Sequence, residues 1–478
     1  HLSIRRQRQM CIRDRIYTQC LAEAAYYIES NGEAAIVDPL REVQPYIDMA
    51  EKNGAKIKYV LETHFHADFV SGHLDLAKKT GATIVYGPTA KPNFDAHVAF
   101  DGEILQLGDV QIKVLHTPGH TMESSTFLLI DEAGKDHSIF TGDTLFLGDV
   151  GRPDLAVKTD LSREDLAAHL FDSLRIKIMP LADEVIVYPG HGQGSACGKH
   201  MSSETVDTLG NQKKFNYALR ADMTKEEFVK EVTSDLVAPP QYFPKNAVMN
   251  KMGYESIDEI LAHGVIGLDV KEFKQTIEKN GAMVLDTRPK EQFAQGFIPG
   301  STFIGIDDTF APWVGALITD LKTPIVFLAE PGKEEEVVIR LSRVGYDNAL
   351  GFLQGGIEAW KEAKEAVQTV NEVTAEEFVS IFEEGANLLD VRKESEFESQ
   401  HIIGATNFPL DFINKNINSL DKESKWFVHC AGGYRSMIAS SILMANGYKN
   451  IVNIKGGFKA LKETTLPMTE FHEQITML

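Results

Sequence analysis

The sequence is poor in cysteine, in basic residues and in long apolar runs. Its 478 residues include four cysteines. None forms a CxxC pair, which excludes a disulfide framework and favours a reducing, cytoplasmic setting. No run approaches the roughly 18 apolar residues of a membrane span, so we expect no membrane partner. Since 48 Lys and Arg stand against 69 Asp and Glu, for a net charge of -21, we expect no nucleic-acid partner.

The length and composition are those of a globular chain with several domains. Hydrophobic residues make up 43% and charged residues 24%, and at roughly 100–200 residues per domain about three domains are expected. The first residues are basic without an apolar centre, so they are not a secretory signal. We assign a non-native leader at 1–15, a first domain at 16–245, a linker at 246–265, a second domain at 266–368, a third at 370–468 and a tail at 469–478.

The first domain is rich in short β-type runs. Helical patterns flank these runs at Val43–Lys52 and Arg163–Leu174, so two sheets with helices outside are expected. The predicted strands are Ala34–Val37, Ile57–Glu62, Thr83–Tyr86, Ile104–Leu107, Gln111–Leu115, Ser125–Ile130, Ser138–Phe140 and Val185–Tyr188.

The rest of the chain contains an internal repeat. Leu388–Leu410 resembles Val284–Ile306, and the two copies are offset by roughly 100 residues, which is a domain length rather than a solenoid unit. Each copy alternates helical segments with apolar strands. This pattern predicts two duplicated α/β domains with parallel sheets.

Histidines and carboxylates follow four apolar strands of the first domain. Strand ends of this kind meet at one edge of the sheets, and the residue types are those that ligate metals, so we predict a metal site. The clusters are Thr63-His64-Phe65-His66-Ala67-Asp68, Pro118-Gly119-His120-Thr121, Thr141-Gly142-Asp143 and Pro189-Gly190-His191-Gly192.

This set of clusters resembles the metallo-β-lactamase superfamily, and within it the glyoxalase II-like mononuclear iron persulfide dioxygenases. The resemblance covers essentially the whole first domain. It implies an αββα sandwich with a metal at its rim. The implied iron ligands are His64, His120 and Asp143, with His66, Asp68 and His191 close by.

One position departs from the dinuclear hydrolases of the superfamily, which usually carry HxHxDH. Phe69 replaces the final histidine and cannot ligate a metal. Two histidines and one carboxylate on one ion form the facial triad that suits non-haem Fe(II). We therefore predict one Fe(II) per chain, with Zn2+ as the alternative metal because affinity order alone favours zinc over ferrous iron.

Two further residues are candidates near this site. Arg152 matches an arginine that lines the substrate pocket of the resembling family, and its guanidinium could bind a carboxylate of a thiol carrier. A local ion pair with Asp154 is the alternative. Cys197, in a small-residue loop after His191, is a candidate persulfide relay, or else a buried filler.

The third domain contains a cysteine between a predicted strand, Trp426–His429, and a helical run, Met437–Ala445. Free backbone N–H groups and the positive end of the helix dipole surround such a cysteine and favour its thiolate. The loop residues are Cys430, Gly432, Gly433, Arg435 and Ser436. This loop resembles the active site of rhodaneses, which implies a Cys430 persulfide. Related phosphatases use a loop one residue longer.

The second domain has lost this nucleophile. Aligning Val428-His429-Cys430 with Phe327-Leu328-Ala329 places Ala329 at the cysteine position, and an alanine cannot carry a persulfide. We predict a rhodanese-like scaffold or docking domain without rhodanese chemistry.

The domain order resembles the bacterial multidomain persulfide dioxygenase–sulfurtransferases. It implies oxidation of a small-molecule thiol persulfide with O2 to sulfite and thiol, coupled to thiosulfate sulfurtransferase activity in sulfide detoxification. A glyoxalase II-type metal-dependent thioester hydrolase and a persulfide carrier that is no oxygenase are the alternatives. We also expect a homo-oligomer.

Overall fold

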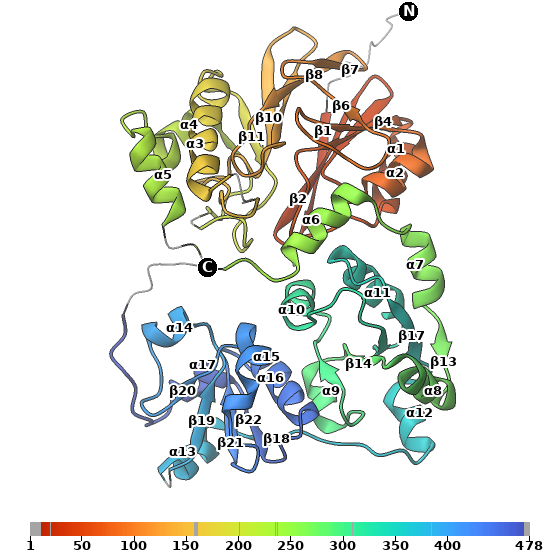
Figure 1. Ribbon diagram of the computed structural model, residues 1–478, viewed down its shortest axis with the longest axis vertical. Helices are drawn as coiled ribbons and strands as arrows, with labels where there is room; N and C mark the ends of the chain where they lie inside the picture. Colours follow the sequence, from red (N-terminus) through yellow and green to blue (C-terminus); the bar gives the residue numbers. More distant parts are fainter. Residues whose placement is uncertain are drawn as a thin grey trace, which may run out of the picture. The chain divides into compact units, whose positions relative to one another are not determined.

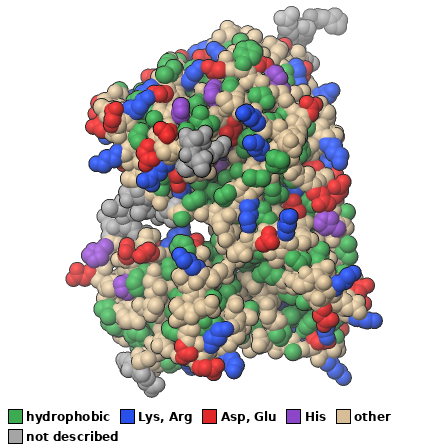
Figure 2. All heavy atoms as spheres, viewed as in Figure 1, with side chains coloured by type: hydrophobic (Ala, Val, Ile, Leu, Met, Phe, Trp, Pro, Cys, Tyr) green, Lys and Arg blue, Asp and Glu red, His purple; other side chains and the backbone are tan. Residues whose placement is uncertain are grey.

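The computed structural model describes residues 11–19, 21–156, 161–199, 201–234, 236, 238–307, 309–383 and 385–472. The chain divides into two compact units, one built mainly from residues up to Ile257 and the other mainly from Asp258 onward (Figure 1). Among the described residues, no helix combines the length and apolar character needed to cross a bilayer. On the face in Figure 2, acidic and basic side chains are interspersed rather than gathered by sign.

The first unit contains two six-stranded sheets. The first sheet has the order β1 (Cys11–Thr18), β2 (Glu23–Ser30), β3 (Glu33–Val37), β4 (Lys56–Glu62), β5 (Thr83–Tyr86) and β6 (His97–Val98). The second has the order β12 (Asp207–Thr208), β11 (Ile186–Pro189), β10 (Asp136–Gly142), β9 (Ser125–Ile130), β8 (Val110–His116) and β7 (Ile104–Leu107). Its helices are α1 (Gln44–Asn53), α2 (His73–Thr80), α3 (Arg163–Ser173), α4 (Leu209–Phe215), α5 (Lys225–Thr233) and α6 (Phe243–Met252).

The strands alternate between two buried layers, which makes the unit a sandwich. Tyr26 faces the core between the sheets, whereas its neighbour Tyr27 packs in the layer of α1 and α2. Both side chains are buried because neighbouring residues of a strand point to opposite faces. On the other side, Leu170 of α3 and Phe228 of α5 cover the second sheet. The predicted αββα architecture is confirmed.

The second unit contains two five-stranded parallel sheets. Helix α7 (Ile257–Gly264) precedes them. The first sheet has the order β13 (Gly267–Leu268), β17 (Ala349–Leu353), β16 (Ile325–Leu328), β14 (Met283–Asp286) and β15 (Thr302–Phe303). The second has the order β18 (Asn371–Val373), β22 (Ile451–Ile454), β21 (Trp426–His429), β19 (Asn387–Asp390) and β20 (Thr406–Asn407). The predicted pair of α/β domains with the same topology is therefore confirmed.

Helices connect the parallel strands of both domains. The second domain of the chain carries α8 (Val270–Asn280), α9 (Lys290–Gln295), α10 (Phe310–Leu317), α11 (Glu334–Arg343) and α12 (Gly356–Glu362). The third domain carries α13 (Ala375–Glu383), α14 (Glu394–Ser399), α15 (Ile413–Asn416), α16 (Tyr434–Ala445) and α17 (Gly457–Leu461). Helix α16 begins at Tyr434 rather than at the predicted Met437, because Gly433 adopts a left-handed φ of 106° and caps the helix.

Candidate metal centre and cysteine loop

Three strand ends of the first unit bring His64, His120 and Asp143 together. His64 follows β4, His120 follows β8 and Asp143 follows β10. Asp143 Oδ2 lies 4.0 Å from His64 Nε2 and 3.5 Å from His120 Nε2. All three side chains are buried, and their potential ligand atoms lie within 4.8 Å of one another. The sequence-predicted ligand set therefore converges.

Hydrogen bonds behind the two histidines fix which ring nitrogen faces Asp143. His120 Nδ1 donates to the Arg152 carbonyl at 2.9 Å, so its Nε2 presents a lone pair. His64 Nδ1 lies 3.0 Å from Thr63 Oγ1, and that hydroxyl in turn donates to Asp38 Oδ2 at 2.8 Å. Such outer partners set the tautomer of a ligating histidine.

The charges of these three side chains suit a bound cation. Asp143 Oδ2 is buried without a hydrogen-bond partner, although a buried carboxylate oxygen normally has one. Burial lowers the pKa of His64, so its ring stays neutral and able to ligate. Burial alone would raise the pKa of Asp143, but the charge and the hydrogen bond of His191 hold it well below its usual range. Two imidazoles and an orphaned carboxylate oxygen form a donor set that fits a divalent transition metal.

His191 connects Asp143 to a second buried acid. Its Nδ1 lies 2.8 Å from Asp143 Oδ1, and its Nε2 lies 2.7 Å from Asp68 Oδ2. Burial opposes protonation of this ring, but the two carboxylates raise its pKa well above the usual value. Gly190 is required beside it, since a Cβ there would lie only 2.9 Å from Asp143 Oδ1.

Cys197 lies at the same cluster. Its sulfur and the ligand atoms of Asp68 and His191 fall within 4.8 Å of one another. Burial and the charges of Asp143 and Asp68 raise the pKa of the Cys197 thiol well above its usual value. The structure thus places a protonated thiol beside Asp68 and His191, which the sequence predicted to lie close to the metal ligands.

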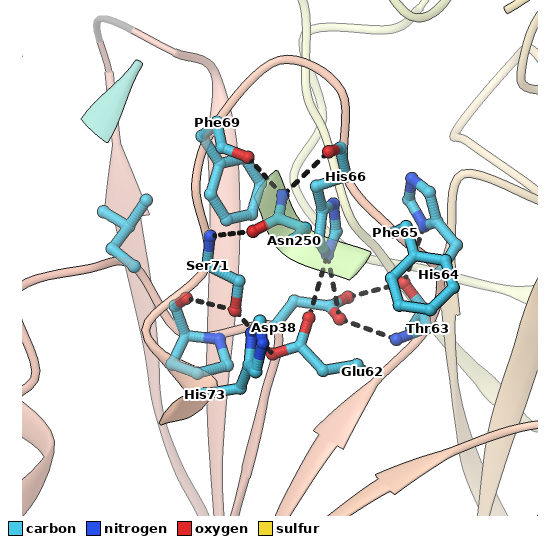
Figure 3. A network of polar contacts seen from close by, with 12 residues as sticks. Asp38, Glu62, Thr63, His64, Phe65, His66, Phe69, Ser71, His73 and Asn250 are labelled. Carbon is cyan, nitrogen blue, oxygen red and sulfur yellow. Dashed lines mark hydrogen bonds and ion pairs between the residues drawn. The ribbon is translucent and has the colours of Figure 1, made fainter. Parts of the chain in front are cut away.

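His66 is held by a separate buried network (Figure 3). Its Nε2 lies 3.1 Å from Asp38 Oδ1 and 3.7 Å from Glu62 Oε2, so it faces these acids rather than Asp143. Burial and the charge of Asp38 raise the pKa of Glu62, and the Ser71 hydroxyl donates to Glu62 Oε1 at 2.5 Å.

The loop that follows His66 is fixed by one side chain. Asn250 Nδ2 donates to the carbonyls of His66 and Phe69, both at 2.8 Å, and its Oδ1 accepts from the Ser71 N–H (Figure 3). The Phe69 ring is fully buried, with its centroid 4.3 Å from that of His66. The position where the dinuclear pattern has a histidine is therefore filled by a packed apolar ring.

Arg152 is paired within its own loop. Its guanidinium makes two 2.7 Å hydrogen bonds to the carboxylate of Asp154, and its Nη1 lies 3.3 Å from the Ala196 carbonyl. Of the two interpretations of Arg152, the local ion pair is the one that this structure contains.

Cys430 lies between β21 and α16, where the sequence places it. The Gly433 N–H donates to Cys430 Sγ at 3.1 Å, and the thiol is buried. Ser436 Oγ donates to Asn453 Oδ1 at 2.7 Å and lies 3.2 Å from the Gly433 carbonyl. The loop therefore directs backbone N–H toward the sulfur, as an anion-holding nest does.

Arg435 is anchored by an acid of α14. Its two terminal nitrogens lie 2.5 and 2.8 Å from the carboxylate oxygens of Glu396. Burial alone would lower the pKa of Arg435, but Glu396 raises it. This ion pair holds the guanidinium at the rim of the cysteine loop.

Sequence reasoning missed Asp38 and Glu62. Both follow or end apolar strands of the first sheet, β3 and β4, and a carboxylate at the buried end of such a strand was the available signal. Their contact with His66 depends on the pairing of β3 with β4, which lie in parallel.

The fold and the site define an αββα sandwich with a candidate metal centre, joined to two α/β domains of one topology. The family model of the metallo-beta-lactamase superfamily matches residues 19–191, and that of the rhodanese-like domain matches residues 269–363 and 374–464. The chain belongs to the metallo-beta-lactamase superfamily and carries two rhodanese-like domains after its metallo-beta-lactamase domain.

Proteins with two kinds of name are similar to the first domain. A probable hydroxyacylglutathione hydrolase of Schizosaccharomyces pombe is 33% identical over 215 residues, which are 40% of this chain and 79% of that protein. The mitochondrial persulfide dioxygenase ETHE1 of Homo sapiens is 29% identical over 212 residues, which are 44% of this chain and 74% of that protein. A crystal structure of a metallo-beta-lactamase from Staphylococcus aureus is 30% identical, with a TM-score of 0.62, and covers 72% of this chain and 98% of that one.

Proposed function

We propose that the chain oxidises the persulfide of a low-molecular-weight thiol, such as glutathione persulfide, with O2. The overall reaction is GSSH + O2 + H2O → GSH + H2SO3, in which the terminal sulfur loses the electrons that O2 accepts. The observation that carries this proposal is the ligand set His64, His120 and Asp143, from which His66 is diverted. Two imidazoles and one carboxylate on one ion suit non-haem Fe(II).

Each residue of the centre has a role in this proposal. His64, His120 and Asp143 would hold one Fe(II), which supplies the one-electron chemistry that O2 requires. His191 keeps the Asp143 carboxylate oriented and its charge balanced through the 2.8 Å contact. Cys197 would pass sulfane sulfur at the edge of the site, for which its thiol would first have to lose the proton that its raised pKa retains.

Arg152 would bind a carboxylate of the thiol carrier. Because Asp154 occupies its guanidinium, a substrate carboxylate would have to take the place of that partner. A planar guanidinium can exchange one carboxylate for another without loss of geometry.

The third domain would move sulfane sulfur in the same sulfide-detoxifying process. Cys430 would accept the sulfur as a persulfide, with Gly432 and Gly433 forming the loop around it and the Gly433 N–H contacting the sulfur. Arg435 and Ser436 would keep this loop in shape. Fusion to the oxidising domain raises the effective concentration of the shared sulfur compounds.

A thioester hydrolase of the hydroxyacylglutathione type is the second candidate. The 33% identity to the Schizosaccharomyces pombe protein favours it. Zn2+ would replace iron, and a second ion would need ligands. Phe69 and the diverted His66 count against that second ion. A persulfide carrier without oxygenase activity is the third candidate.

Oxygen uptake tests the proposal. Protein loaded with Fe(II) under anaerobic conditions is mixed with glutathione persulfide, and O2, sulfite and thiosulfate are measured. We expect uptake in the parent chain and its loss in His120→Ala. The matched control is His116→Ala, since His116 ends β8, the strand that precedes His120, but contacts the Met122 carbonyl outside the site.

Each alternative has its own outcome. Thioester turnover with two zinc ions per chain and no oxygen uptake would favour the hydrolase. Sulfur transfer that survives His64→Ala, with no oxygen uptake by the parent chain, would favour the carrier. Either result would overturn the proposal.

A further inference from the structure

A cavity of about 440 Å³ opens in front of Cys430, within the unit that contains both rhodanese-like domains. Two domains line it. The third domain contributes Cys430, Gly432, Tyr434 and Arg435, and the second domain contributes Lys290, Thr309 and Trp313. The domain that lacks a nucleophile therefore supplies part of the wall of the cysteine site.

Direct hydrogen bonds hold this wall against the cysteine loop. The Tyr434 hydroxyl, one residue beyond Gly433, donates to the Gly305 carbonyl at 2.8 Å. The Phe303 N–H donates to Ser441 Oγ of α16 at 2.9 Å, and both residues are fully buried. Because α16 starts at the cysteine loop, these bonds fix the second domain relative to that loop.

The two cationic side chains that line the cavity differ in how closely an acidic partner pairs with them. Arg435 is balanced by the two-fold contact with Glu396. Among the ion pairs of the described residues, Lys290 pairs with Glu291 alone, with 3.4 Å between Nζ and Oε1, and its side chain is 38% exposed. A Cβ built on Gly433 would lie 3.9 Å from Lys290 Cε, so the lysine stem runs beside the loop that contacts the sulfur.

We propose that Lys290, beside the apolar wall of Trp313, forms a binding site for the SO3 group of thiosulfate or sulfite opposite Cys430. This inference rests on the sulfurtransferase part of the proposed function. In that reaction the Cys430 thiolate attacks the sulfane sulfur of thiosulfate, a new S–S bond forms, and the old S–S bond breaks with its electron pair leaving on sulfite. The reverse reaction returns thiosulfate. The SO3 group is anionic in both directions, so an ammonium group stabilises it in either.

Alkylation of Cys430 tests the site without requiring turnover. Iodoacetate and iodoacetamide are similar in size and differ in charge, and the full chain is treated with each while the Cys430 peptide is followed by mass spectrometry. In Lys290→Ala, the iodoacetate rate should fall about three- to fivefold relative to iodoacetamide, the range of a partly exposed charge pair. Lys290→Arg should restore the ratio.

A second lysine of the same domain provides the control. Lys361 is similarly exposed, at 44%, and pairs with Glu358, but it does not line the cavity. Lys361→Ala should leave the alkylation ratio unchanged. In steady-state transfer from thiosulfate to cyanide, Lys290→Ala should raise KM for thiosulfate by a similar factor and leave kcat nearly unchanged.

The outcomes separate this site from the proposed function. An unchanged alkylation ratio in Lys290→Ala would overturn the anion site. A changed ratio in a chain that shows no thiosulfate transfer would support the anion site and refute the sulfurtransferase function.

Discussion

Replacing Thr63 with valine tests how the metal centre is built. The two side chains have the same shape, so the change removes only the hydroxyl that joins His64 to Asp38. Two contacts are lost: the 2.8 Å bond to Asp38 Oδ2 and the 3.0 Å contact with His64 Nδ1. Thr63 is 1% exposed, so water cannot replace the hydroxyl.

The size of the expected change in metal affinity follows from the polar atoms that Thr63→Val leaves without partners. A buried polar atom without its partner costs about 1–3 kcal/mol, and His64 Nδ1 becomes such an atom. Asp38 keeps its contacts with the Thr63 N–H at 2.7 Å and with His66 at 3.1 Å, but Oδ1 makes both of them, so Asp38 Oδ2 also loses its partner. Loss of an outer partner of a metal ligand typically weakens binding about 10- to 100-fold. We expect a decrease of that size.

A competition titration measures this effect. Metal-free chain is titrated with Zn2+ against a chromogenic chelator, and the dissociation constants of the parent, Thr63→Val and Thr63→Ser are compared. Thr63→Ser keeps the hydroxyl and should bind like the parent. Equal affinity in Thr63→Val would show that the hydroxyl does not orient His64, and the reasoning about the outer partners would fail.

Three further predictions concern other parts of the chain. Phe69→His should allow a second zinc ion to bind, measured by elemental analysis, because it restores the missing imidazole; a single ion would show that the packed loop, rather than this residue, sets the stoichiometry. Cys430→Ser should abolish transfer of sulfur from thiosulfate to cyanide while oxygen uptake with glutathione persulfide continues, since the metal ligands lie in the other unit. Burial opposes ionisation of the Asp390 carboxyl, but His429 and Arg392 lower its pKa. The ionised carboxylate therefore contributes stability at neutral pH that is lost as the pH falls below about 4. Burial raises the pKa of Asp286, so it contributes stability that grows on acidification. Urea unfolding at pH 5 and pH 3 should therefore show a smaller acid loss in Asp390→Asn and a larger one in Asp286→Asn, and equal losses would contradict both assignments.

Much of the first unit could be predicted from the sequence, because strand patterns and chemistry coincide there. The strands at Thr83–Tyr86, Ile104–Leu107 and Ser125–Ile130 have the predicted bounds. Strand β2 was not predicted, since its alanines weaken the β-type signal that branched residues give. Strand β1 starts inside the segment we assigned to the leader, and residues 1–10 lie outside the described part of the chain.

Contacts between distant elements could not be predicted. The histidine pattern predicts which residues converge, but not that Asp38 and Glu62 divert His66, since this depends on the register of two strands. The cavity at Cys430 likewise depends on contacts between elements that lie far apart in the sequence. Lys290 lies in a repeat copy that looks inactive by itself, and only the packing of the two domains brings it to the cysteine loop.

The duplicated domains also separate structural residues from chemical ones. In the third domain, Arg392 bonds Asp390 and the Gln400 carbonyl, the latter at 2.9 Å. In the second, Arg288 bonds Asp286 and the Gly296 carbonyl in the same way, again at 2.9 Å for the carbonyl. A copy with alanine in place of the nucleophile keeps this buried pair intact. The pair therefore belongs to the fold of each domain rather than to the sulfur chemistry, because its geometry persists where the nucleophile is absent.

That comparison also bears on how a domain without a nucleophile would serve the proposed sulfur transfer. The second domain retains the α/β fold, and its α9 and α10 supply Lys290 and Trp313 to the cavity. A wall built from a separate folded domain is fixed by hydrogen bonds between backbone and side chain, as at Phe303 and Tyr434, rather than by the conformation of a flexible loop. Placing a charged residue on a rigid element reduces the entropy lost when an anion binds, so in the proposed anion site the second domain would add selectivity to a nucleophile that lies in the third domain.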